Sequence, residues 1–116
     1  LLGAAVAIEL GAGFVAVRKP GGMLPGDKLT ATAGKDYRGL RHELRMQSVL
    51  GPGDLALLVD DWAETGSQSG AVRELVTRSG ATWAGTSLMV DQLPDEVRAS
   101  LGEVRSLVPA AALGDC

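Results

Sequence analysis

The sequence is poor in the residues that form disulfides and metal sites. It has one cysteine, Cys116, and one histidine, His42, among 116 residues. A single cysteine excludes an internal disulfide and a metal site built from cysteine pairs, which fits a reducing compartment. We therefore expect a cytoplasmic protein in which Cys116 is inert and His42 is solvated.

The sequence also lacks an excess of positive charge and a long apolar run. Its net charge is −3 and its pI about 5.0, which argues against a nucleic-acid partner bound through bulk charge. The apolar residues 1–10 are far short of the roughly 20 that a membrane span needs, and no basic region precedes them. We expect neither a nucleic acid nor a membrane as partner. Because the chain opens within an apolar segment, we expect a fragment that lacks an N-terminal part.

What the sequence does contain is typical of a globular α/β protein. Hydrophobic residues make up 46% and charged residues 22%, and the length suits one small domain over residues 1–116. A strand–helix–strand unit at 55–90 predicts parallel strands, so we expect a mostly parallel sheet with flanking helices. The predicted helices are 1–10, 67–79 and 94–101, and the predicted strands are 14–17, 29–33, 43–46, 55–59, 81–90 and 104–108.

Residues 27–46 are polar and alternate enough to form an antiparallel flap. The two flap strands would enclose a stretch rich in charge and glycine. A polar flap of this kind is a candidate mobile lid over a site.

Residues 55–68 organise the rest of the chain. An apolar run over 55–59 predicts a strand buried on both faces, and Asp60 and Asp61 follow it. Burying two like charges is costly, so we expect this pair at the strand's carboxyl end, facing a cleft. Thr65-Gly66-Ser67 then opens a helix, and a glycine loop at a helix N-terminus favours anions. The two carboxylates can accept hydrogen bonds from vicinal hydroxyls of a ligand, and the loop can hold its phosphate. Together they indicate a phosphorylated ribose.

Arg18 and Lys19 end another predicted strand. Ligands of open parallel sheets bind beyond the carboxyl ends of the strands, so these cations are candidates for the same site. Ordinary solvated strand-end cations are the alternative.

Two stretches resemble the type I phosphoribosyltransferases. Val59-Asp-Asp-Trp-Ala-Glu-Thr-Gly66 is similar to that family's strand, acidic pair and small-Thr-Gly loop. Leu10-Gly-Ala-Gly-Phe-Val-Ala-Val-Arg-Lys-Pro-Gly-Gly-Met-Leu-Pro-Gly26 is similar to a segment of the adenine phosphoribosyltransferases. The resemblance implies that family's fold and the transfer of ribose 5-phosphate from phosphoribosyl pyrophosphate to a purine base, with adenine giving AMP in purine salvage.

The resemblance also implies ligand contacts. Asp60 and Asp61 would bind the ribose hydroxyls, and Arg18 and Lys19 would lie beside the base and pyrophosphate. Mg²⁺ would be held mainly by pyrophosphate and ribose oxygens, with no metal-binding residue assigned. A homodimer is implied for the full-length protein. The residues implied to hold the 5′-phosphate are Ala63, Glu64, Thr65, Gly66 and Ser67.

Two candidate catalytic residues depart from the adenine pattern. Asp36 stands in the flap where adenine enzymes carry a glutamate, and Glu64 stands where they carry a small residue. Hypoxanthine-guanine enzymes have an aspartate at the position of Glu64, near the purine ring. Glu64 is therefore either an acid or base acting on the purine or a glutamate at a helix start, favoured by the helix dipole.

The choice of base stays open between adenine and hypoxanthine or guanine. Two further alternatives are a transcriptional regulator of this fold that binds phosphoribosyl pyrophosphate, and an interaction protein with a degenerate site.

Overall fold

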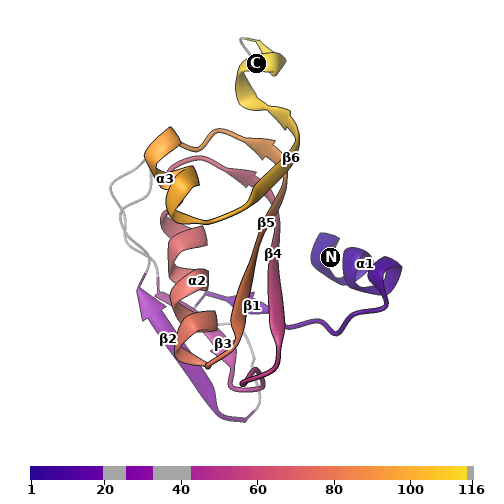
Figure 1. Ribbon diagram of the computed structural model, residues 1–116, viewed down its shortest axis with the longest axis vertical. Helices are drawn as coiled ribbons and strands as arrows, with labels where there is room; N and C mark the ends of the chain where they lie inside the picture. The colour runs from indigo at the N-terminus through magenta and orange to yellow at the C-terminus, as the bar shows by residue number, and fades with distance from the viewer. Residues whose placement is uncertain (20–25, 33–42, 115–116) are drawn as a thin grey trace. The chain divides into compact units, whose positions relative to one another are not determined.

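The computed structural model describes residues 1–19, 26–32 and 43–114, and Figure 1 shows the elements in order. Each predicted helix and strand is present, although β1 is shorter and shifted relative to the predicted strand 14–17. The elements are α1 (Leu2–Leu10), β1 (Val17–Arg18), β2 (Lys28–Thr32), β3 (Glu43–Gln47), β4 (Leu55–Ala63), α2 (Ser67–Arg78), β5 (Thr82–Asp91), α3 (Asp95–Ser100), β6 (Val104–Pro109) and a 3₁₀ helix (Ala110–Leu113).

The described residues group into two compact units. One comprises Val15–Ala56 and Ser67–Trp83, and the other comprises Leu1–Phe14, Leu57–Gly66 and Ala84–Cys116. We call them the antiparallel unit and the parallel unit, after the strand pairings they contain. The prediction of a single domain stays a prediction.

The antiparallel unit is a three-stranded sheet with a helix against it. Strand β3 lies between β1 and β2, and pairs with both in the antiparallel sense. Helix α2 contacts β2 and β3. This confirms the predicted antiparallel pairing of the flap strands, while residues 33–42 between them lie outside the described residues. Whether the flap acts as a lid stays a prediction.

Helix α2 buries the face that its sequence predicts. Val72, Leu75 and Val76 follow one another at helical spacing, and all three are buried. The strands contribute Ala31, Leu44 and Met46 to the same unit's buried residues. The helix is followed by Gly80, whose φ of 83° is the left-handed conformation that commonly ends helices.

The parallel unit contains most of the sheet β4-β5-β6. Strands β5 and β6 are parallel, with Thr86 opposite Val104 and Val90 opposite Val108. Helix α3 connects them, so each β-α-β step returns the chain to the same sheet. The predicted α/β class with a parallel sheet and helices is confirmed.

Strand β4 is longer and more exposed than predicted. It continues to Ala63 rather than ending at residue 59, so Asp60 and Asp61 lie within the strand. Leu55 is 71% exposed and Leu57 43%, so the prediction of a strand buried on both faces is wrong for the described residues. Among the described residues β4 pairs on one side only, with β5, so its side chains are less covered than those of a central strand. Within the described ranges, no helix is long and apolar enough to cross a membrane.

Candidate functional site

Asp60 and Asp61 are adjacent residues near the end of β4. The backbone N–H of Asp61 donates to Asp60 Oδ1 at 2.8 Å, and the N–H of Trp62 donates to Asp61 Oδ1 at 2.7 Å. Each carboxylate is thus held by the residue that follows it. A carboxylate has about four acceptor positions, so both retain capacity for ligand hydroxyls.

The two carboxylates differ in environment. Asp61 is exposed, whereas Asp60 is partly buried. Burial raises the pKa of the Asp60 carboxyl above its ordinary value of 3.8, and the nearby carboxyl of Asp61 adds to that rise. A pair of ligand hydroxyls would donate hydrogen bonds to the ionised form, which favours the carboxylate that burial disfavours. The pair is therefore suited to a diol.

Trp62 and Gln92 link the end of β4 to the chain that leaves β5. The indole Nε1 of Trp62 donates to Gln92 Oε1 at 2.8 Å, and the N–H of Gln92 donates to Ala63 O at 2.9 Å. Trp62 remains about half exposed beside the carboxylates. The sequence did not single out Gln92, because a lone polar residue after a strand carries no motif.

The glycine loop, residues 63–67, follows directly. Ala63 is buried, Glu64 is exposed, and Ser67 begins α2. Gly66 has a φ of +81°, and a Cβ at this position would lie 2.3 Å from Val97 Cγ1 and 3.1 Å from Leu93 Cδ2. Glycine is thus required both by the backbone and by the space available.

The loop has the features of an anion site. The first turn of a helix presents backbone N–H groups and the positive end of the helix dipole. Here that turn follows a glycine loop, and five residues, 62–66, separate it from the carboxylate pair in the chain. The carboxylate pair and the loop therefore follow one another along one short segment, and their binding of ribose hydroxyls and phosphate stays a prediction. The exposed Glu64 leaves both of its predicted roles open.

Arg18 and Lys19 lie at the end of β1 in the antiparallel unit, where Arg18 is opposite Arg45. Both are exposed. Asp60 and Asp61 belong to the parallel unit, so the prediction that all four residues share one site stays a prediction. The candidate catalytic residue Asp36 falls outside the described residues, as does His42, which we expect to be solvated.

The carboxylate pair also fits the metal that the resemblance implies. The described residues contain no group of three or more His, Cys, Asp or Glu side chains placed to hold a metal ion. Mg²⁺ is commonly bound through one or two carboxylates together with substrate phosphates. Asp60 and Asp61 supply hard oxygen donors of that kind, which suits a metal that arrives with a phosphorylated ligand.

Replacing Gly66 tests the close approach of the loop. We expect Gly66→Ala to lower the free energy of unfolding by roughly 2–4 kcal/mol, from the left-handed backbone and the added overlap with Val97. Gly53→Ala is the matched control, because Gly53 has a φ of +93° and open space around it. It should lose only about 1–2 kcal/mol. Urea denaturation of both variants gives the values, and equal losses would show that the contact with Val97 is unimportant.

Replacing Asp60 tests its electrostatic environment. A carboxyl whose folded-state pKa is raised binds more protons when folded, so it lowers stability as the pH rises through that pKa. Asp60→Asn removes this effect and keeps an oxygen for the N–H of Asp61. At pH 7 the variant should therefore be at least as stable as wild type, and the difference should vanish below about pH 3.8. A variant that unfolds more easily at pH 7 would contradict this account.

Comparison with known proteins shows which of them are similar to this chain in sequence. No family model matches the chain. It is 41% identical over 91 residues to adenine phosphoribosyltransferase from a Synechococcus strain, covering 78% of this chain and 52% of that protein. It is 36% identical over 104 residues to the enzyme of the same name from Streptococcus uberis, covering 90% and 59%.

Solved structures show which proteins share the fold. Adenine phosphoribosyltransferase from Thermoanaerobacter pseudethanolicus matches with a TM-score of 0.81 and 29% identity, over 92% of this chain and 62% of that one. The enzyme from Giardia lamblia, complexed with 9-deazaadenine, matches with a TM-score of 0.79 and 30% identity, over 91% and 61%. This chain thus spans about half to three fifths of these relatives' lengths. Its resemblance to the type I phosphoribosyltransferases of the adenine type is confirmed in sequence and in fold.

Proposed function

We propose that this chain carries the ribose-phosphate-binding part of a phosphoribosyltransferase. The reaction is the transfer of ribose 5-phosphate from phosphoribosyl pyrophosphate to a purine, with release of pyrophosphate. The observation that carries the proposal is the carboxylate pair Asp60-Asp61 followed by the glycine loop at the start of α2. The sequence identity to adenine phosphoribosyltransferases supports the same conclusion independently.

Adenine is the proposed base, with AMP as the product in purine salvage. The Giardia enzyme was solved with 9-deazaadenine, and a yeast relative with 31% identity and a TM-score of 0.73 was solved with adenine and an imino-altritol bisphosphate. We further propose a cytoplasmic homodimer that uses Mg²⁺, which when bound would neutralise phosphate charge.

In the proposed mechanism the chain positions the sugar and stabilises charge. Asp60 and Asp61 accept hydrogen bonds from the ribose hydroxyls, and the glycine loop holds the 5′-phosphate. These contacts fix the anomeric carbon in place while its bond to pyrophosphate breaks and a bond to the base nitrogen forms. The negative carboxylates also favour the positive charge that develops on the sugar ring. Pyrophosphate leaves with the bonding electron pair.

Glu64 is the proposed acceptor of the proton that the base nitrogen loses. It lies on the loop beside the phosphate-binding residues and is exposed, so its carboxylate is accessible to a bound purine. The flap with Asp36 would close over the reacting centre and exclude water.

Turnover with a panel of bases tests the proposed function. The full-length protein with phosphoribosyl pyrophosphate and Mg²⁺ should release pyrophosphate when adenine is added, and more slowly with hypoxanthine or guanine. The double variant Asp60→Asn/Asp61→Asn should fold, as seen by circular dichroism, and should lose ribose 5-phosphate binding in calorimetry. Binding without turnover would point to a regulator of the same fold. Neither binding nor turnover with any base would refute the proposal.

Glu64→Ala tests the proton acceptor separately. General-base contributions are typically about 10²- to 10⁴-fold, so kcat should fall within this range while ribose 5-phosphate affinity stays near wild type. The control is Glu74→Ala, which changes an exposed glutamate within α2 and outside the loop. Unchanged turnover in Glu64→Ala would leave Glu64 as a helix-start residue only.

A further inference from the structure

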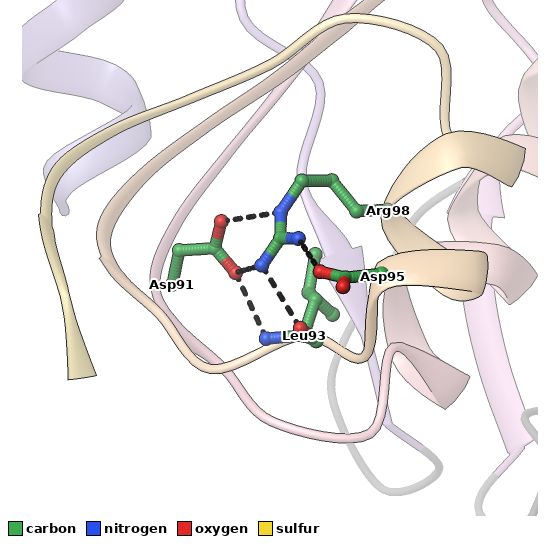
Figure 2. A network of polar contacts seen from close by, with 4 residues as sticks. All are labelled: Asp91, Leu93, Asp95 and Arg98. Atoms are coloured by element: carbon green, nitrogen blue, oxygen red, sulfur yellow. Dashed lines mark hydrogen bonds and ion pairs between the residues drawn. The ribbon is translucent and has the colours of Figure 1, made fainter. Parts of the chain in front are cut away.

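A group of polar contacts fastens helix α3 to the end of β5, as Figure 2 shows. The guanidinium of Arg98 donates two hydrogen bonds to the carboxylate of Asp91, from Nε to Oδ2 at 2.8 Å and from Nη2 to Oδ1 at 3.1 Å. Nη2 also donates to Leu93 O at 2.9 Å, and Nη1 donates to Asp95 Oδ1 at 2.7 Å. We call these four residues the Arg98 clasp.

The clasp holds Leu93 through its backbone at both ends. While Arg98 binds the carbonyl of Leu93, Asp91 Oδ1 accepts from the N–H of the same residue at 2.8 Å. These two bonds fix the backbone of Leu93 on both sides of its Cα, and with it the direction of its side chain. That side chain is buried.

The Leu93 side chain is directed at the glycine loop. Leu93 Cδ2 and Val97 Cγ1 are the two groups that would meet a Cβ on Gly66, at 3.1 and 2.3 Å. Leu93 is held by the clasp, and Val97 precedes Arg98 in α3. Gly66, Leu93 and Val97 all belong to the parallel unit. The clasp therefore determines the surface on which the loop rests.

Arg98 is not itself placed to bind a phosphate. Four of its five guanidinium N–H groups donate to Asp91, Asp95 and Leu93. The Asp91 side chain is only 10% exposed, and the bond from Arg98 lowers the pKa of this carboxyl, so the pair is ionised at neutral pH. Two carboxylates around one cation leave a local negative charge, which would repel an anion. Any effect of Arg98 on ligand binding must pass through Leu93 and Val97.

We propose that Arg98 and Asp91 are positioning residues for the phosphate-binding glycine loop, acting through the contact of Leu93 and Val97 with Gly66. The assignment of phosphate as the ligand rests on the proposed function, whereas the mechanical link between clasp and loop does not. The bidentate pair between Arg98 and Asp91 holds α3 in place. Leu93 and Val97 are thereby held against Gly66, and this contact sets the direction of the loop's N–H groups.

The test compares Arg98→Ala with the matched control Arg105→Ala. Arg105 is exposed on β6 in the same unit, and it pairs with its near neighbour Glu103. Residue-resolved amide hydrogen exchange reports the loop at Thr65 and Gly66, and whole-unit opening at Leu107 in β6, whose amide faces β5 in the pairing register. Calorimetry with ribose 5-phosphate reports the site. Both are measured well below the melting temperature.

In Arg98→Ala we expect the exchange rates at Thr65 and Gly66 to increase by a factor at least about ten times larger than the factor in β6. The affinity for ribose 5-phosphate should fall about 10- to 100-fold, since small misplacements are costly. Arg105→Ala should change neither by more than about twofold, as exposed pairs contribute little. Arg98→Lys keeps the charge but loses the fork, so it should lie between wild type and Arg98→Ala. Should Arg98→Ala not fold, Arg98→Lys and Asp91→Asn carry the same comparison.

Two results would overturn the link between clasp and loop. One is faster exchange that is equal in the loop and in β6, which would mean general destabilisation. The other is faster exchange confined to residues 92–98 with an unchanged loop. If exchange in the loop rises as expected but wild type does not bind ribose 5-phosphate, the clasp stands as a loop support and the proposed function fails.

Discussion

The structure around the candidate site depends on one steric constraint, the absence of a side chain at Gly66. Val97 and Leu93 approach its backbone so closely that no Cβ fits, and the left-handed φ of +81° also favours glycine. This approach allows the loop after β4 to pack on α3. An anion-binding loop needs its N–H groups held in fixed directions. The packing under Gly66 provides that rigidity.

A second constraint is the proximity of two like charges. Asp60 and Asp61 sit side by side in β4, and partial burial raises the pKa of Asp60. Such a pair stores unfavourable electrostatic energy that a ligand with hydroxyl donors or positive charge can relieve. Opposite charges are arranged differently at α3, where Arg98 neutralises Asp91 and fixes the backbone. In the proposed account, one carboxylate pair binds a ligand and one ion pair supports the backbone.

Local patterns in the sequence predicted much of this arrangement. Helix α2 was predictable from the spacing of Val72, Leu75 and Val76, and the loop from Thr65-Gly66-Ser67 before that helix. The extent of β4 was predicted wrongly, because charged residues usually end a buried run, whereas an edge strand tolerates them. The family resemblance added the ligand assignments, all of which remain predictions.

The contacts that the sequence did not reveal are those between elements. Asp91 and Arg98 are seven residues apart across a loop, so no helical spacing connects them, and their pairing depends on the angle at which α3 leaves β5. The same holds for Gly66 and Val97, which are far apart in the chain and meet only after folding. Such contacts depend on tertiary structure rather than on local propensity.

The most direct test of the central claim is a titration of the isotope-labelled chain with ribose 5-phosphate, followed by amide chemical shifts. The claim that Asp60-Asp61 and the glycine loop form one ribose-phosphate site predicts that the largest shifts fall on the amides of residues 60–67. It also predicts that inorganic phosphate shifts only the loop amides among these. Shifts that are absent from this segment at saturating ligand, or that are largest elsewhere in the chain, would contradict it.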